Sequence, residues 1–137
     1  MSYDVMVFED AKAPRTKEEF VEWYEKQVAW SEGHDYSDIS IAAPSLQNFY
    51  EALKKSYIFA DDLGEDGNYN GEEGGKYIDH AAIGREIIYM CFPRGNAAEI
   101  YEDIMDMAMD NGVGIVDVEG GSEVIFANGE YIYDPFY

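Results

Sequence analysis

The clearest pattern of apolar and polar positions along the chain lies between Glu86 and Val118. Its first part, residues 87–92, holds six apolar residues in a row, a length typical of a strand buried on at least one face. In residues 97–111 the apolar positions recur at steps of three and four, as they do on one side of a helix. The apolar run 113–118 predicts a second strand. We expect this strand, helix and strand to form the core of the protein.

The predicted helix has recognisable ends. Asn96 and Glu99 have the spacing of a capping box, and Gly112 is suited to end the helix. Acids occupy the side opposite the apolar residues, and like charges at helical spacing destabilise a helix. This face is therefore a candidate surface for binding a partner, and its acids are Glu99, Glu102, Asp103, Asp106 and Asp110.

Similar patterns predict elements on both sides of this unit. Two helices are expected at 17–30, with Thr16 and Glu19 as a capping box, and at 45–57. Further strands are expected at 3–8, 76–83, 86–92, 124–127 and 131–133. The dipeptides Gly84-Arg85 and Asn128-Gly129 are short enough to join antiparallel neighbours.

The order of these elements predicts the fold class. If the first two helices are treated as one crossover, the order becomes β-α-β-β-α-β, the ferredoxin-like motif. The prediction is an α+β fold of one domain, residues 1–137, with an extra short helix and a C-terminal β-hairpin. Its sheet is expected to be antiparallel, with the helices on one face. A fold of this kind supports many functions and therefore decides none.

Charge narrows the possible partners. The chain has 29 acidic and 9 basic residues, for a net charge of −20, and no Lys, Arg or His follows Arg94. Nucleic acids and anionic membranes need a cationic surface, so neither is expected as a partner. A cationic protein or a divalent metal would suit the charge, and solubility alone is the other explanation. A predicted exposed loop adds a second acidic surface, formed by Asp61, Asp62, Glu65, Asp66, Glu72 and Glu73.

Several short motifs resemble those of a family of small bacterial proteins without an established activity. They are Met1-Ser2-Tyr3-Asp4, Trp30-Ser31-Glu32-Gly33-His34-Asp35-Tyr36, Ile83-Gly84-Arg85 and Gly112-Val113-Gly114. The resemblance implies a bacterial cytoplasmic protein and supplies no catalytic residues. In size and acidity the chain is also similar to immunity proteins that neutralise toxins.

A dense polar cluster follows the first predicted helix. Together with residues of the strand pair, it could supply a metal site or a general acid and base; the candidates are Glu32, His34, Asp35, His80 and Arg85. The chain has only two histidines, which excludes a site built from many of them. Capping of a helix end and a loop is the structural alternative, and we predict that His34, Asp35 and His80 do not converge.

Other chemistry has weaker support in the sequence. Residues Asp62 to Glu73 match a calcium-binding loop at five positions, but Gly64 stands at position three and no exiting helix follows. No phosphate-binding loop is recognisable, and we predict no cofactor and no resident metal. The single cysteine, Cys91, is expected to be a packing residue. The first residues lack the features of a signal peptide, which suggests a cytoplasmic protein.

Three hypotheses about function follow. In the first, the protein is an acidic binding module that masks a cationic partner, in its strongest form an immunity protein that neutralises a toxin. In the second, it is an enzyme that uses the region of His34, Asp35 and His80 on a small molecule. In the third, the acidity serves solubility alone. The sequence favours the first and leaves the oligomeric state open.

Overall fold

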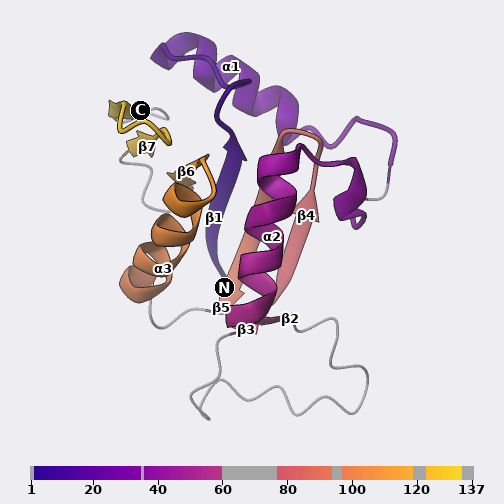
Figure 1. Cartoon of the computed structure of the whole chain (residues 1–137). Helices are drawn as coiled ribbons and strands as arrows, with labels where there is room; N and C mark the ends of the chain where they lie inside the picture. The colour runs from indigo at the N-terminus through magenta and orange to yellow at the C-terminus, as the bar shows by residue number, and fades with distance from the viewer. Residues whose placement is uncertain (1, 35, 60–76, 94–96, 119–122, 134–137) are drawn as a thin grey trace.

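The computed structural model describes residues 2–34, 36–59, 77–93, 97–118 and 123–133. Within these ranges the chain forms an α+β structure, with three α-helices and an open antiparallel sheet of six strands (Figure 1). The helices are α1 (Lys17–Gln27), α2 (Pro44–Ser56) and α3 (Ala97–Asp110), with a short 3-10 helix η1 (Ile39–Ile41). The sheet strands are β1 (Ser2–Glu9), β4 (His80–Ile83), β5 (Ile87–Pro93), β6 (Val113–Asp117), β7 (Glu123–Ile125) and β8 (Tyr131–Tyr133).

Strand β1 lies in the interior of the sheet, whose order is β4-β5-β1-β6-β7-β8. It pairs with β5 on one side, where Val5 lies opposite Met90, and with β6 on the other, where Val5 lies opposite Asp117. The predicted antiparallel sheet is therefore confirmed. The complete sheet does not have the exact order of the ferredoxin-like motif, which ends after four strands, because β7 and β8 extend it.

Both faces of the sheet are covered by helices. Val5 and Val7 of β1 pack in one apolar cluster with α2 and α3, which contribute Phe49 and Ile104 among others. Figure 1 shows these two helices in front of the sheet, with α1 apart from them at the top of the view. The prediction of helices on one face is therefore wrong for α1.

The opposite cluster explains the position of α1. The alternate β1 residues Met6 and Phe8 are fully buried there with Phe20 of α1 and Phe126. Successive side chains of a strand point to opposite faces, so the consecutive apolar residues 5–8 of β1 need a cover on both sides. Helix α1 provides the second cover.

The ends of the helices match the sequence in most places. Thr16 Oγ1 accepts a hydrogen bond from the Glu19 backbone N–H, so the predicted cap at Thr16 is confirmed. The Glu19 carboxylate accepts from the Thr16 hydroxyl, whereas a complete capping box would have it accept from the Thr16 backbone N–H. Gly112, with φ of 70°, follows α3 as predicted. Helix α1, however, ends at Gln27 and not at 30, because Trp30 takes a left-handed conformation with φ of 54°.

The strand predictions need one correction. The expected strand 76–83 is divided into β3 (Tyr77–Ile78) and β4, and β3 pairs in parallel with β2 (Ile58–Phe59) in a separate small sheet that was not predicted. The turns were predicted correctly: β4 and β5 are antiparallel across Gly84-Arg85, and β7 and β8 are antiparallel across Asn128-Gly129. Gly129 has a φ of 93°, which suits glycine at this position.

Candidate functional site

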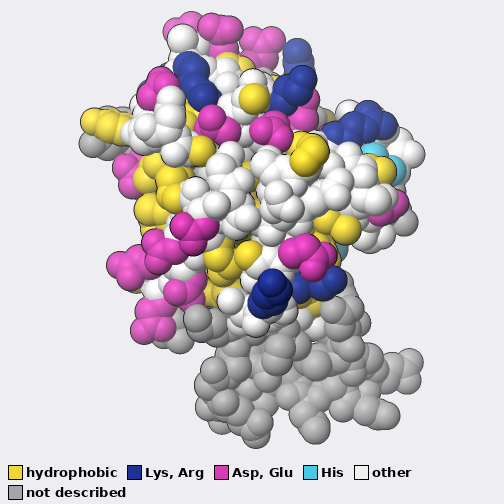
Figure 2. All heavy atoms as spheres, viewed as in Figure 1, with side chains coloured by type: hydrophobic (Ala, Val, Ile, Leu, Met, Phe, Trp, Pro, Cys, Tyr) yellow, Lys and Arg dark blue, Asp and Glu magenta, His cyan; other side chains and the backbone are white. Residues whose placement is uncertain are grey.

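Helix α3 carries the most uniform charged surface in the described part of the chain. Its apolar side buries Ile104 and Ala108 against the sheet. Its other side exposes four carboxylates along the length of the helix: Glu99, Glu102, Asp106 and Asp110. Figure 2 shows acidic side chains gathered where α3 lies in Figure 1, with no Lys or Arg among them on the visible face. The sequence predicted this surface, and the structure leaves these four residues accessible.

The fifth predicted residue of this face, Asp103, has a different environment. It is partly buried, and its Oδ2 accepts a hydrogen bond from the Tyr57 hydroxyl at 3.2 Å. Burial raises the pKa of Tyr57 above its ordinary value, and the charge of Asp103 raises it further. Asp103 therefore joins α3 to the end of α2, a structural role that the sequence pattern did not distinguish from that of its exposed neighbours.

Several basic residues form ion pairs away from the exposed acids of α3. Lys26 lies 3.9 Å from Glu22 within α1, and Lys54 lies 3.9 Å from Glu51 within α2. Within the ranges that the structure describes, the side chains of Glu99, Glu102, Asp106 and Asp110 form no ion pair or hydrogen bond. The last turn of α3 has no basic residue. These four carboxylates are thus uncompensated by the described fold.

The second predicted acidic surface lies outside the described residues. This applies to Asp61, Asp62, Glu65, Asp66, Glu72 and Glu73, and with them to the whole candidate calcium loop from Asp62 to Glu73. Asp35 of the polar cluster is also outside the described ranges. Within the ranges that the structure describes, no group of three or more His, Cys, Asp or Glu side chains is placed to hold a metal ion.

The polar cluster after α1 folds onto the turn between β4 and β5. Glu32 Oε1 accepts a hydrogen bond from the Arg85 backbone N–H at 3.1 Å and lies 2.7 Å from His34 Nε2. The Tyr36 backbone N–H donates to His34 Nδ1 at 3.1 Å, so Nδ1 acts as an acceptor and has no proton. In the tautomer that fits this contact, Nε2 donates to Glu32. Both ring nitrogens of His34 are therefore occupied.

The same turn receives contacts from several other segments. The Arg85 carbonyl accepts from the Ala43 backbone, and Glu86 accepts from Trp23 Nε1 at 3.0 Å and Gln27 Nε2 at 3.2 Å. The Glu86 carboxylate thus fixes the last turns of α1 to the sheet. These bonds give the turn a structural role, in agreement with the alternative of loop and helix-end capping.

The other two members of the predicted polar site do not join it through their side chains. Arg85 is exposed and contributes its backbone atoms to the contacts above. His80 is the first residue of β4, opposite Cys91, whereas Glu32 contacts the turn after the last residue of that strand. Cys91, the single cysteine of the chain, is partly exposed. The described part of the cluster therefore does not bring His34 and His80 together.

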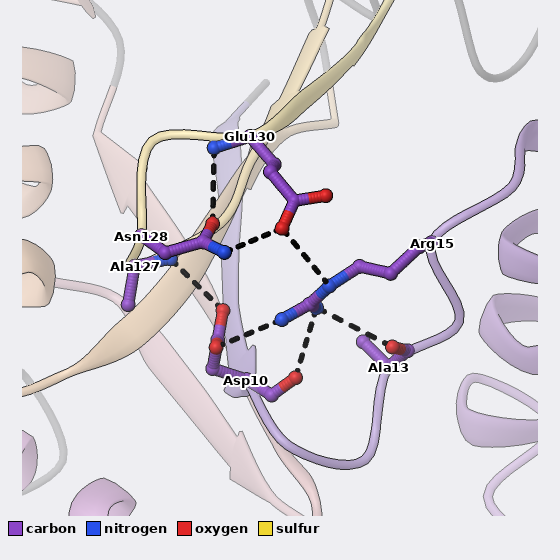
Figure 3. Close-up of polar contacts among 6 residues, drawn as sticks. All are labelled: Asp10, Ala13, Arg15, Ala127, Asn128 and Glu130. Carbon is purple, nitrogen blue, oxygen red and sulfur yellow. Dashed lines mark hydrogen bonds and ion pairs between the residues drawn. The ribbon is translucent and has the colours of Figure 1, made fainter.

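Sequence reasoning missed a network that connects the loop after β1 to the β7–β8 hairpin (Figure 3). The Arg15 guanidinium donates to the Asp10 carboxylate at 3.0 Å and lies 3.9 Å from the centre of the Phe126 ring. It also lies 4.0 Å from Glu130, and Asp10 accepts from the Ala127 backbone N–H at 2.9 Å. More than 110 residues separate Asp10 from Ala127, and no short motif could have indicated this contact.

A group of aromatic rings was also missed. The Trp30 ring lies 5.0 Å from that of Tyr36 and 6.0 Å from that of Tyr89, with interplanar angles of 77° and 89°. Trp30 and Tyr36 both have positive φ, at 54° and 61°. For a bulky residue this conformation costs about 1–2 kcal/mol, and such strain is found most often at functional sites.

Comparison with protein-family models, with curated proteins and with solved structures finds no match. None of the helices within the described ranges has both the length and the apolar character needed to cross a membrane. The assignment of a function therefore rests on the surfaces described above.

Proposed function

We propose that this protein is an acidic binding module that uses the exposed face of α3 to bind a basic region of a partner protein. In its strongest form it is an immunity protein that neutralises a cationic toxin. The observation that supports this proposal is the exposure of Glu99, Glu102, Asp106 and Asp110 on one helix, without a basic partner in the described chain.

The energetics of the helix favour a use for these charges. Glu102, Asp106 and Asp110 follow one another at intervals of four residues, where like charges repel. Asp110 is also the last residue of α3, at the negative end of the helix dipole. Both effects destabilise the helix, and no described contact offsets them. A basic partner would convert the same charges into favourable interactions.

The expected mechanism is electrostatic steering. A face of one sign attracts an oppositely charged partner during diffusion and raises the association rate, and salt screens this attraction beyond a Debye length of about 8 Å at physiological ionic strength. Dissociation depends more on the close contacts made after the encounter. Charge changes on α3 should therefore act mainly on the association rate.

The test begins with capture of basic proteins from the source cell on the immobilised chain, followed by kinetics with the captured partner. The triple variant Glu102→Lys, Asp106→Lys and Asp110→Lys should lower the association rate at least about tenfold, within the range that steering provides. The matched control reverses three exposed acids of α1, Glu18, Glu22 and Glu25, which changes the net charge equally. It should reduce the rate much less.

Three results would refute the proposal. They are an acidic captured partner, an association rate that is indifferent to salt, and equal effects of the two triple variants. Equal effects would mean that net charge matters and the α3 face does not. Solubility would then be the better explanation of the charge of −20.

A further inference from the structure

The Trp30 side chain is exposed, and its backbone has a positive φ that is strained for a bulky residue. Among the described large apolar residues, Trp30 and Tyr131 are the exposed ones, with 37% and 55% of their surface accessible. Trp30 follows α1 with a φ of 54°, a conformation that glycine adopts without strain at the end of a helix. The indole must therefore contribute something that glycine cannot.

The rings beside Trp30 are fixed in orientation. Tyr36 and Tyr89 stand nearly perpendicular to the indole, at 77° and 89°. The Tyr36 hydroxyl accepts from the Glu32 backbone N–H at 2.7 Å, and the Tyr89 hydroxyl donates to the Asp4 carboxylate at 2.9 Å. We call Trp30, Tyr36 and Tyr89 the aromatic corner. Hydrogen bonds connect it to the backbone of Glu32 and to the carboxylate of Asp4.

We propose that the aromatic corner receives the ammonium group of a lysine side chain from a protein partner. The faces of aromatic rings attract cations, tryptophan most strongly. The Asp4 carboxylate, which accepts from the Tyr89 hydroxyl, adds to this attraction. Because the rings pack edge to face on one another, the ammonium group would lie on the exposed part of the indole. A compact ammonium group needs less ring surface than a planar guanidinium, which stacks flat on a ring.

This inference rests on the proposed function only in requiring a basic partner. The corner belongs to another surface, because Tyr89 packs with the cluster that α1 covers and α3 packs on the opposite face of the sheet. A partner that contacts both surfaces would wrap around the protein.

The test uses NMR spectroscopy of the full chain with octalysine as the probe, in about 0.15 M NaCl, where distant charges are screened. The chain has two tryptophans, so two indole N–H signals are expected, and Trp30→Gly assigns them by removing one. Octalysine should shift the Trp30 signal saturably. The Trp23 signal is the internal control, because its N–H is bonded to Glu86 and should not move.

Matched probes and variants test whether the positive charge of lysine is needed for binding. Octalysine acetylated on every side chain has no charge there and should leave the Trp30 signal unchanged. Trp30→Gly should raise the Kd of octalysine by about two- to fivefold, the range of a cation bound to an exposed ring. Trp30→Leu, which keeps an apolar side chain, should do the same if the glycine variant fails to fold. Tyr131→Ala, at the opposite edge of the sheet, is the control and should change the Kd less than the Trp30 variants do.

The possible failures of this inference and of the proposed function are distinguishable. If octalysine binds without moving the Trp30 signal, the lysine site is refuted and the α3 proposal stands. An equal shift with the acetylated probe would mean an apolar contact and would also refute it. If the Trp30 signal responds while reversal of the α3 acids changes neither octalysine binding nor partner capture, the corner stands and the α3 proposal fails.

Discussion

Gly114 shows how a single missing side chain can determine packing in this core. It lies opposite Phe8 in the sheet, and a Cβ atom at this position would stand 2.2 Å from the Phe8 ring. The ring can therefore lie flat over the neighbouring strand. There it meets Phe20, Trp23 and Phe126 edge to face, with ring centres 5.4–5.9 Å apart. An absent methyl group makes this aromatic cluster possible.

We therefore expect Gly114→Ala to destabilise the protein by about 1–3 kcal/mol, the usual cost of forcing extra volume into a packed core. Urea unfolding of the variant measures this cost directly. The same substitution in a Phe8→Leu background should cost less, because the smaller side chain can move away. An equal loss in both backgrounds would show that the strain comes from the backbone and not from the ring.

Arg15 is a residue whose geometry matters more than its charge. Its guanidinium contacts a carboxylate and the face of Phe126 at the same time. Arg15→Lys keeps the charge but cannot reproduce this planar contact, so we expect a loss of about 1 kcal/mol in unfolding free energy. Lys26→Ala, which removes an ion pair whose side chains are about 75% exposed, should change stability by less than about 0.5 kcal/mol. Comparable losses in the two variants would contradict a special role for Arg15.

Among the helices, α3 offers a test of the position of its charges. Glu99 lies in the first turn, where the helix dipole favours an acid, and Asp110 lies at the last residue, where the dipole opposes one. Both are exposed and both can be neutralised without a change of shape.

We expect Asp110→Asn to raise the free energy of unfolding by about 0.3–1 kcal/mol and Glu99→Gln to lower it by a similar amount. Denaturation at low and high salt measures both effects, and salt should reduce each of them. If both substitutions stabilise the protein, repulsion among the acids outweighs the position of each charge along the helix.

The elements that could be predicted are those with local signals. The cap at Thr16, the glycine after α3 and the hairpin at Asn128-Gly129 depend on nearby residues, and each was placed correctly. The face of the sheet that α1 covers could not be predicted in this way, because it depends on pairing and packing between segments far apart in the sequence. The apolar run at residues 5–8 of β1 nevertheless contained the information that both faces are buried.

The candidate surfaces also divide into features with local signals, which could be predicted, and features that depend on distant residues. The acids of α3 were predicted because helical spacing alone places them on one side. Asp103 was assigned wrongly to the exposed face, because its contact comes from Tyr57, which is 46 residues away. The cluster of Glu32 and His34 was recognised by composition, but its dependence on the β4–β5 turn required the folded chain. The aromatic corner required a left-handed Trp30, which no rule of propensity favours.

The chain as a whole should be sensitive to high pH through its buried tyrosines. Burial, followed by the charges of Glu123 and Asp117, raises the pKa of Tyr101 from 10.0 to about 12. Burial and nearby acids raise the pKa of Tyr24, Tyr57 and Tyr89 as well. The unfolded chain then loses these protons at a lower pH than the folded one, so stability is retained below pH 10.0 and falls as the pH rises towards 12.

Urea unfolding at a series of pH values should show this alkaline loss. Tyr101→Phe should make it less steep, with Tyr131→Phe at an exposed position as the control. At neutral pH, Tyr101→Phe should leave stability unchanged or raise it by up to about 1 kcal/mol, because the buried Tyr101 hydroxyl has no hydrogen-bond partner among the described residues. An unchanged slope would mean that Tyr101 does not contribute to the alkaline loss.

The position of β1 between β5 and β6 sets the order in which a newly made chain can fold. Its partners lie at residues 87–93 and 113–117, so β1 leaves the ribosome long before either of the strands that it pairs with. At about 5–20 residues per second this interval lasts several seconds or longer. During that time an apolar strand is available to the wrong partner. Contacts so distant in sequence also slow folding after release. The risk that β1 pairs wrongly is therefore greatest while the chain is still being synthesised.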